Sequence, residues 1–292
     1  MILMRAGFVS IFGKPNAGKS TLLNALLGEK LAITSPKVQT TRHRIKGILT
    51  SPEYQVIFSD TPGVIQPKYK LQEKMMQAVR SSLEDADLGM FLFAADDNPE
   101  EADAIFSSLS LKAPSIVVIN KTDAIKPSVL TSVRSFFEGK PYAKEIVEVS
   151  ALHQHNLDQL LNTILKYLPE GEPFFEGDDI SDLPTRFFVA EMIREKIFQL
   201  YQQEIPYETT VLVGAFEEKT TLTKIVADII VQRESQKAII LGEGGKMIKQ
   251  VGSAARKDIE AFIGRKVFLE LFVKVRPKWR DNELFLKEYG YT

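Results

Sequence analysis

The sequence of 292 residues predicts an α/β protein made of two domains. Its length is the first observation, since one domain usually takes roughly 100–200 residues. The second is that short apolar runs alternate with amphipathic segments over the first 168 residues, which predicts a mostly parallel sheet covered on both faces. The third is a proline-rich acidic stretch followed by a smaller part. We therefore expect a first domain at residues 1–168, a linker at 169–185 and a second domain at 186–292.

In the first domain, the expected elements alternate in order along the chain. Apolar runs typical of buried strands lie at residues 7–12, 54–59, 88–95, 115–119 and 145–149. Helical periodicity is found between and after them, at residues 20–27, 71–83, 100–109, 128–137 and 156–168. The carboxyl ends of parallel strands meet at one edge of a sheet, where open α/β sheets bind ligands.

The linker and the second domain differ in composition from what precedes them. Residues 169–184 hold three prolines, two glycines and six acidic residues, so we expect a solvated interdomain linker. A helix at 187–201 and strands at 209–216 and 222–231 follow. The run 238–241 is too short to assign to helix or strand, and a long helix at 246–263 precedes a last strand at 266–275.

The composition excludes several classes of protein. Hydrophobic residues make up 44% and charged residues 26%, which is ordinary for globular proteins. The absence of cysteine excludes disulfides, thiolate metal sites and a cysteine nucleophile. The longest apolar runs, 90–95 and 116–119, fall far short of the ~18 residues of a membrane span, and no secretory signal is recognisable. We expect a cytoplasmic protein.

Charge is distributed unevenly along the chain. The net charge is −1, but residues 237–280 contain eleven Lys and Arg against four acidic residues. This asymmetry favours a polyanionic partner for the basic part, with a merely solvated basic surface as the alternative.

A phosphate-binding motif lies between the first expected strand and the first expected helix. Backbone N–H groups of such a loop close around phosphates, and the helix N-terminus adds partial positive charge. Lys19 is expected at the β- and γ-phosphates, and the Ser20 hydroxyl on Mg²⁺. Residues 13–20 fit the pattern G-x-x-x-x-G-K-[ST]. Together with Thr21, they are expected to contact the nucleotide: Gly13, Lys14, Pro15, Asn16, Ala17, Gly18, Lys19, Ser20 and Thr21.

Three further motifs, residues 60–63, 120–123 and 150–151, each follow an expected strand. Asp123 can accept both N1–H and the exocyclic amine of guanine, a donor pair that adenine lacks. Lys121 can lie across the base, and the Ala151 backbone N–H can meet the guanine oxygen. The expected nucleotide contacts in these motifs are Asp60, Thr61, Pro62, Gly63, Asn120, Lys121, Asp123, Ser150 and Ala151.

The polar loop 30–44 contains Thr40 and Thr41, of which one hydroxyl can complete Mg²⁺ coordination and sense the γ-phosphate. We favour Thr41 and leave Thr40 open. Mg²⁺ coordination is thus assigned to Ser20, Thr41 and Asp60. Catalysis is assigned to Lys19, Thr41 and Gly63.

A glycine loop in the second domain predicts RNA binding. It fits G-x-x-G and precedes the helix 246–263, in which apolar residues such as Val251 and Ile259 fall on one face and basic residues on the other. Glycines before a basic helical face let the backbone approach nucleic-acid phosphates, as in the KH module. The expected RNA contacts are Gly242, Glu243, Gly244, Gly245, Lys246, Lys249 and Arg256.

Together these motifs resemble the Era family of GTPases. The resemblance rests on residues 39–45 (QTTRHRI), Arg186-Phe187, residues 193–196 (IREK) and residues 204–207 (EIPY), and it covers essentially the whole chain. It implies a P-loop GTPase domain followed by an α+β type II KH domain. It further implies a Mg²⁺-dependent, monomeric GTPase that binds the single-stranded 3′ end of small-subunit (16S) ribosomal RNA during maturation of the small ribosomal subunit. Weak peripheral association with the inner face of the cell membrane is left open.

Two questions stay open in the sequence. Val64 stands where many GTPases have a water-orienting glutamine, so catalysis must come from elsewhere or be slow. Related enzymes use an asparagine at the position of Asn16 to help bind K⁺, although Asn16 can equally just stabilise the loop. The rival function is an RNA-binding chaperone in which GTP hydrolysis is incidental.

Overall fold

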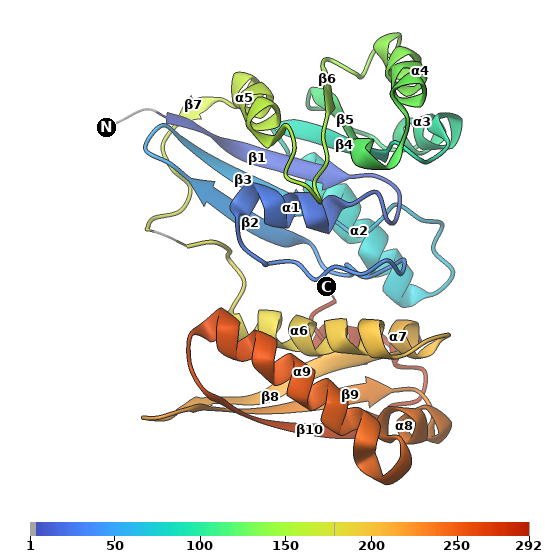
Figure 1. Ribbon diagram of the computed structural model, residues 1–292, viewed down its shortest axis with the longest axis vertical. Helices are drawn as coiled ribbons and strands as arrows, with labels where there is room; N and C mark the ends of the chain where they lie inside the picture. Colours follow the sequence, from blue (N-terminus) through green and yellow to red (C-terminus); the bar gives the residue numbers. More distant parts are fainter. Residues whose placement is uncertain (1–3, 178, 292) are drawn as a thin grey trace. The chain divides into compact units, whose positions relative to one another are not determined.

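The computed structural model describes residues 4–177 and 179–291 (Figure 1). The first three residues, Asp178 of the expected linker and the last residue lie outside the described part. The chain forms two compact units, one comprising the residues up to Pro67 with Met75–Asp182, the other Lys68–Lys74 with the residues from Leu183 onward.

The first unit is built on a mostly parallel sheet with the order β2-β3-β1-β4-β5-β6, with β7 paired to β1. Its parallel strands β3, β1, β4, β5 and β6 confirm the predicted fold class, while β2 and β7 pair antiparallel. The strands are β1 (Met4–Phe12), β2 (Ile45–Thr50), β3 (Tyr54–Asp60), β4 (Leu88–Ala94), β5 (Ser115–Asn120), β6 (Ile146–Glu148) and β7 (Glu170–Gly171).

Five α-helices of this part of the chain lie within a few residues of the predicted ranges. Helices α1 and α5 contact each other on one face of the sheet. The helices are α1 (Lys19–Leu27), α2 (Lys70–Glu84), α3 (Pro99–Ser107), α4 (Pro127–Glu138) and α5 (Leu157–Tyr167), with a 3₁₀ turn at Thr122–Ala124.

Strand β2 is absent from the sequence-based assignment. It lies at an edge of the sheet, paired only with β3, and carries the partly exposed Lys46 between Ile45 and Gly47. Lys46 and Gly47 interrupt the apolar residues of this six-residue strand, so its apolar signal is weak. The polar loop 30–44 therefore ends directly in a strand.

Most described residues of the predicted linker are exposed, in line with the expected solvated segment, but parts of its backbone are also held against the first unit. The Gln55 side chain accepts hydrogen bonds from the backbone N–H groups of Phe174 and Phe175 at 2.7 and 3.0 Å. Farther along, the backbone N–H of Ile48 donates to the Ile180 carbonyl at 3.0 Å. These backbone groups find partners on β2 and β3, which an acidic composition does not reveal.

The second unit is a smaller α+β domain with its own three-stranded sheet, of order β10-β9-β8. Strand β9 pairs parallel with β10 and antiparallel with β8. Helices α6 and α9 pack on one face of this sheet (Figure 1). The elements are α6 (Thr185–Leu200), α7 (Ile205–Glu208), β8 (Thr210–Glu218), β9 (Thr223–Val231), α8 (Glu234–Leu241), α9 (Lys246–Ile263), β10 (Val267–Val275) and α10 (Glu283–Glu288).

Helix α9 has the predicted bounds, and Val251, Ala255 and Ile259 are buried in the core as its periodicity predicted. The unassigned run 238–241 is the second half of α8, in which Ile240 is buried.

Candidate nucleotide and RNA sites

The glycine-rich loop connects the end of β1 to the start of α1. Gly18 adopts a left-handed conformation (φ 95°), and a Cβ there would lie 2.3 Å from the Asn120 side-chain nitrogen. Only glycine meets both requirements. The loop thereby approaches the end of β5 closely, and Asn120 donates to the Ala17 carbonyl at 2.9 Å.

Lys19 lies at the centre of this loop and is almost fully buried. Its ammonium donates to the carbonyl oxygens of Lys14 at 2.8 Å and Gly13 at 3.2 Å. Burial lowers the pKa of Lys19 to about 8, with the charge of Asp60 opposing the shift. A buried cation held by neutral carbonyls is well placed to bind an anion.

Three oxygen-bearing side chains converge beside Lys19. The Ser20 hydroxyl donates to Asp60 Oδ2 at 2.6 Å, and the hydroxyls of Ser20 and Thr41 lie 2.8 Å apart. Burial raises the pKa of Asp60 to about 6 against the opposing effects of Ser20, Lys19 and Thr41. Asp60 Oδ1 is buried without a hydrogen-bond partner among the described residues. Two hydroxyl oxygens beside a buried carboxylate that has an unsatisfied oxygen are ligands that suit Mg²⁺.

The structure distinguishes between the two threonines of the loop 30–44. Thr41 Oγ1 donates to Asp60 Oδ2 at 3.4 Å, whereas Thr40 Oγ1 donates to the Lys37 carbonyl at 2.8 Å. The geometry therefore favours Thr41 as the oxygen ligand.

The segment that follows Asp60 packs closely on the glycine-rich loop. A Cβ at Gly63 would lie 2.7 Å from Pro15, and the Val64 N–H donates to the Gly13 carbonyl at 3.0 Å. Thr61 ties the segment to β1 by donating to the Ile11 carbonyl at 2.8 Å. The segment 61–64 is therefore in direct contact with the glycine-rich loop.

A cavity lies between these segments. The loop 30–44 supplies part of its wall, including Ile33, Thr34, Ser35 and Gln39, which were not among the predicted nucleotide contacts. The polar composition of this loop, which lies between two motifs, is the only sequence signal that could have indicated these lining residues. The lining residues are Pro15, Asn16, Gly18, Lys19, Ser20, Thr21, Ile33, Thr34, Ser35, Gln39, Thr40, Thr41 and Gly63.

The predicted base-recognition residues are tied together by Asn120. Its side-chain oxygen accepts from the Ala151 N–H at 2.9 Å, while its nitrogen holds Ala17. The Ser150 hydroxyl donates to Asp123, and this hydrogen bond is the main cause that lowers the pKa of Asp123. Asp123 is therefore an ionised acceptor, fixed beside the loop 150–151.

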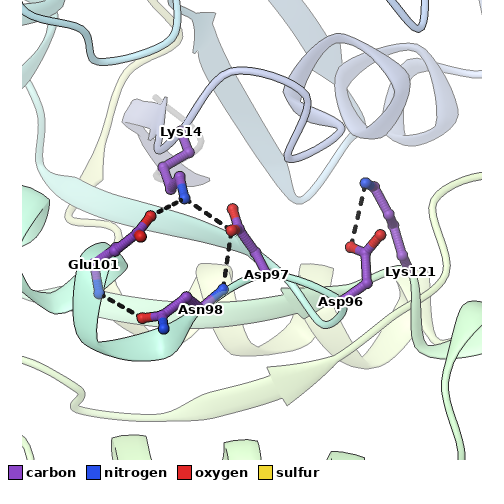
Figure 2. A network of polar contacts seen from close by, with 6 residues as sticks. All are labelled: Lys14, Asp96, Asp97, Asn98, Glu101 and Lys121. Atoms are coloured by element: carbon purple, nitrogen blue, oxygen red, sulfur yellow. Dashed lines mark hydrogen bonds and ion pairs between the residues drawn. The ribbon is translucent and has the colours of Figure 1, made fainter.

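The side chain of Lys14 does not line the cavity. Its side chain turns away from the cavity and binds Asp97 and Glu101 near the start of α3, at 2.8 Å each (Figure 2). Its carbonyl, not its ammonium, meets Lys19.

The predicted RNA-binding residues lie together at the junction of α8 and α9. Gly244 and Gly245 have φ of 57° and 75°, and no atom lies within 4 Å of a Cβ built on either, so the loop is open to approach. The basic side chains of Lys246, Lys249 and Arg256 are exposed.

A groove runs between α9 and β10 and contains an exposed aromatic side chain that was not among the predicted RNA contacts. Phe268 lines it and is 51% exposed. The alternation along 266–275 was a usable signal, since Phe268 falls between residues that face the core. The groove is lined by Ile248, Lys249, Gly252, Ser253, Arg256, Phe268, Leu269 and Leu271.

Comparison with known proteins decides the family. A family model described as a 50S ribosome-binding GTPase matches residues 8–121, and a KH domain model matches residues 204–280. The GTPase Era of Geotalea uraniireducens is 46% identical over 291 residues, covering 98% of each chain. The chain belongs to the Era GTPase family.

Solved structures of Era agree with this assignment over the whole chain. Era in complex with MgGDPNP and nucleotides 1506–1542 of 16S ribosomal RNA has a TM-score of 0.95 at 43% identity, covering 99% of each chain. A single-residue variant of Era from Aquifex aeolicus, bound to GDP and AlF₄⁻, has the same TM-score and identity, covering 99% of this chain and 100% of that one. The predicted resemblance to the Era family and the predicted fold class are confirmed.

Within the described residues, no helix is both long enough and apolar enough to cross a membrane.

Proposed function

We propose that this Era-family chain is a monomeric, Mg²⁺-dependent GTPase whose GTP-bound state binds the single-stranded 3′ end of 16S ribosomal RNA during maturation of the small ribosomal subunit. The observation that carries the enzymatic part is the convergence of Ser20, Thr41 and Asp60 beside the buried Lys19. We propose that residues 1–168 and 186–292 act as its two domains, joined by 169–185.

The phosphate end of GTP is assigned to the loop 13–18 and to Lys19. Lys19, which two loop carbonyls orient, would donate to β- and γ-phosphate oxygens, a strong charge-assisted contact in a buried site. Ser20 and Thr41 would hold Mg²⁺ directly, with Asp60 acting through water. The metal neutralises the charge that develops on the phosphates.

The base end is assigned to the loops that follow β5 and β6. Asp123 accepts N1–H and the exocyclic amine of guanine, and the Ala151 N–H donates to the guanine oxygen. Asn120 keeps these loops in register with the phosphate loop, because its side chain bonds both Ala17 and Ala151. Ser150 holds the Asp123 carboxylate in place.

Catalysis is assigned to Lys19, Thr41 and Gly63. Lys19 stabilises charge on the γ-phosphate, and Thr41 links the loop 30–44 to the metal. The backbone of Gly63 lies against Pro15, where its N–H can meet a γ-phosphate oxygen. The aliphatic Val64 offers no hydrogen bond to the attacking water, so intrinsic hydrolysis should be slow.

The assignment can be tested with Thr41→Ala. The variant should bind GDP like the wild-type protein but lose most Mg²⁺-dependent hydrolysis of radiolabelled GTP. Wild-type hydrolysis in Thr41→Ala would contradict the assigned site. A GTPase-linked function would be lost in cells carrying this variant, whereas the rival chaperone function would be retained.

Stimulation of hydrolysis by K⁺ is proposed from Asn16. Its side-chain nitrogen donates to the Pro36 carbonyl at 2.9 Å, which fixes the amide where Asn16 lines the cavity and could offer its oxygen to a cation. We expect hydrolysis to be about tenfold faster in K⁺ than in Na⁺ at equal ionic strength, the effect of one added cation contact of ~1.4 kcal/mol. Asn16→Ala should remove the difference. Equal wild-type rates in the two salts would leave Asn16 with a structural role only.

The RNA site is assigned to the loop 242–245 and the groove beside it. The open glycine backbone can approach phosphates, Lys246, Lys249 and Arg256 supply positive charge, and Phe268 offers a surface on which a base can stack. This combination suits single-stranded RNA.

Two substitutions test the glycine loop and the basic face of α9. Gly244→Asp should abolish RNA binding, because it places a side chain and a negative charge where phosphate approaches. Lys249→Ala should weaken all RNAs similarly and reduce the salt slope by roughly 0.7. Titrations at several salt concentrations measure both, with GTP affinity as the control that should not change. Wild-type RNA affinity in Gly244→Asp would contradict the assigned loop.

A cytoplasmic location with weak peripheral binding to the inner face of the cell membrane is also proposed. The exposed basic residues of α9 support it, since anionic headgroups attract such surfaces. Co-sedimentation should occur with anionic but not neutral vesicles, and RNA should compete. Failure to sediment with anionic vesicles at low salt would rule the association out.

A further inference from the structure

The connection between β4 and α3, together with the first turn of α3, contains a group of acidic side chains that none of the nucleotide-binding motifs includes. Asp97 and Glu101 bind Lys14 of the glycine-rich loop, and Asp96 binds Lys121 of the base-recognition loop (Figure 2). Two lysines from two different nucleotide-binding loops are thus held by one short segment.

The two carboxylates that bind Lys14 are themselves fixed. Asp97 Oδ1 accepts from the Asn98 N–H at 2.9 Å as well as from Lys14. Asn98 caps α3 by accepting from the Glu101 N–H at 2.9 Å, and Pro99 starts the helix. Asp97 is thus rigidly placed, and Glu101 extends from a capped first turn of the helix.

The Lys14–Asp97 pair is well shielded for a contact of this kind. The side chains are 22% and 28% exposed, whereas Glu101 is 67% exposed. Burial opposes the charge of Lys14, but hydrogen bonds and charge interactions with Asp97 and Glu101 outweigh it and raise the pKa of Lys14. The two carboxylates therefore favour the charged form of Lys14.

The backbone of the same residue reaches the catalytic lysine. The Lys14 carbonyl accepts from Lys19 Nζ at 2.8 Å and from the Ala17 N–H at 3.4 Å. Anchoring the Lys14 side chain therefore fixes the carbonyl that orients Lys19. The anchor also keeps a second ammonium out of the phosphate cavity, whose lining does not include Lys14.

We propose that Asp97 and Glu101 are positioning residues for nucleotide binding, which act by holding Lys14 so that the loop 13–18 and Lys19 are preformed for phosphate. The inference rests on the proposed nucleotide site. Asp96, at 3.4 Å from Lys121 and about half exposed, makes a weaker contact and is not part of the proposal.

The test is the dissociation rate of fluorescent mant-GDP, measured by displacement with excess GDP in stopped flow. Asp97→Asn combined with Glu101→Gln should accelerate dissociation about three- to tenfold, as expected for losing a partly shielded ion pair that acts on one loop. Most of the effect should appear in KM for GTP rather than in kcat. An unchanged dissociation rate would overturn the proposal.

A matched control lies on the same helix. Asp103 of α3 pairs with Lys140 at 2.6 Å, with exposures of 26% and 27%, on residues away from the glycine-rich loop. Asp103→Asn therefore removes an ion pair of α3 with comparable shielding and should leave nucleotide dissociation unchanged. If Asp103→Asn accelerates dissociation as much as the double variant, the effect comes from the stability of α3, and the proposal is wrong.

Lys14 variants show whether the carboxylates act through this side chain. Lys14→Met should accelerate dissociation as much as the double variant, and combining all three changes should add nothing further. Additive effects would overturn the proposal. Lys14→Arg keeps a cation between the carboxylates and should release nucleotide more slowly than Lys14→Met. If the wild-type protein does not bind mant-GDP, the proposed nucleotide site itself has failed, which is a different result from equal rates in wild type and variants.

Discussion

Lys19→Ala is expected to weaken GTP binding by about 100-fold or more, since a buried charge-assisted contact to phosphate is worth about 3 kcal/mol or more. The ammonium is almost fully buried, and its present partners are two neutral carbonyls. No other described side chain supplies a cation to the cavity lining. Isothermal titration calorimetry with GTP measures the loss directly.

The control for this variant is Lys166→Ala, which removes an exposed lysine paired with Glu145 on the same unit. It should leave GTP affinity unchanged. Because Lys19 also bonds the loop backbone, thermal unfolding should accompany the titration to show that the variant is folded. Wild-type affinity in folded Lys19→Ala would remove the glycine-rich loop from the site.

Asp123→Asn is expected to change the base preference of the protein from guanine to xanthine. The substitution replaces one acceptor by a donor at the position that faces N1 and the exocyclic group, leaving one mismatched polar contact with guanine. The GTP affinity should fall about 100-fold, because each unsatisfied buried contact to a charged group costs roughly 1.5–3 kcal/mol. The Asn carbonyl can still accept from Ser150, so the loop should keep its position.

Competition of GTP and XTP for the same variant provides an internal control, since folding defects would lower both affinities together. The wild-type protein should prefer GTP, and the variant should prefer XTP. A variant that still prefers GTP would show that Asp123 does not read the base.

Much of the nucleotide site could be predicted because its motifs directly follow expected strands. Residues 60, 120 and 150 lie at the carboxyl ends of β3, β5 and β6 or directly beyond them, and a parallel sheet brings such ends to one edge. The bounds of α9 were equally predictable. Its helical periodicity is bracketed by Gly245 and Gly264, both in left-handed conformations that mark the helix ends.

What could not be predicted depends on pairs that are distant in sequence. Lys14 and Asp97 are 83 residues apart, and neither the charge of the motif nor the acidity of residues 96–101 indicates that they meet. The packing of the linker depends similarly on Gln55, which reads as an ordinary strand residue until Phe174 and Phe175 lie beside it. Such side-chain contacts follow from tertiary packing and leave no local periodicity.

The central claim is that the nucleotide state controls RNA binding, and the most direct test is the affinity for a fluorescent RNA of the 16S 3′ end in the presence of GDPNP or GDP, each with Mg²⁺. We predict binding about tenfold tighter with GDPNP, a coupling of roughly 1.4 kcal/mol, and no binding in either state for Gly244→Asp. Equal affinities in the two states would contradict the claim and support an RNA-binding chaperone in which hydrolysis is incidental.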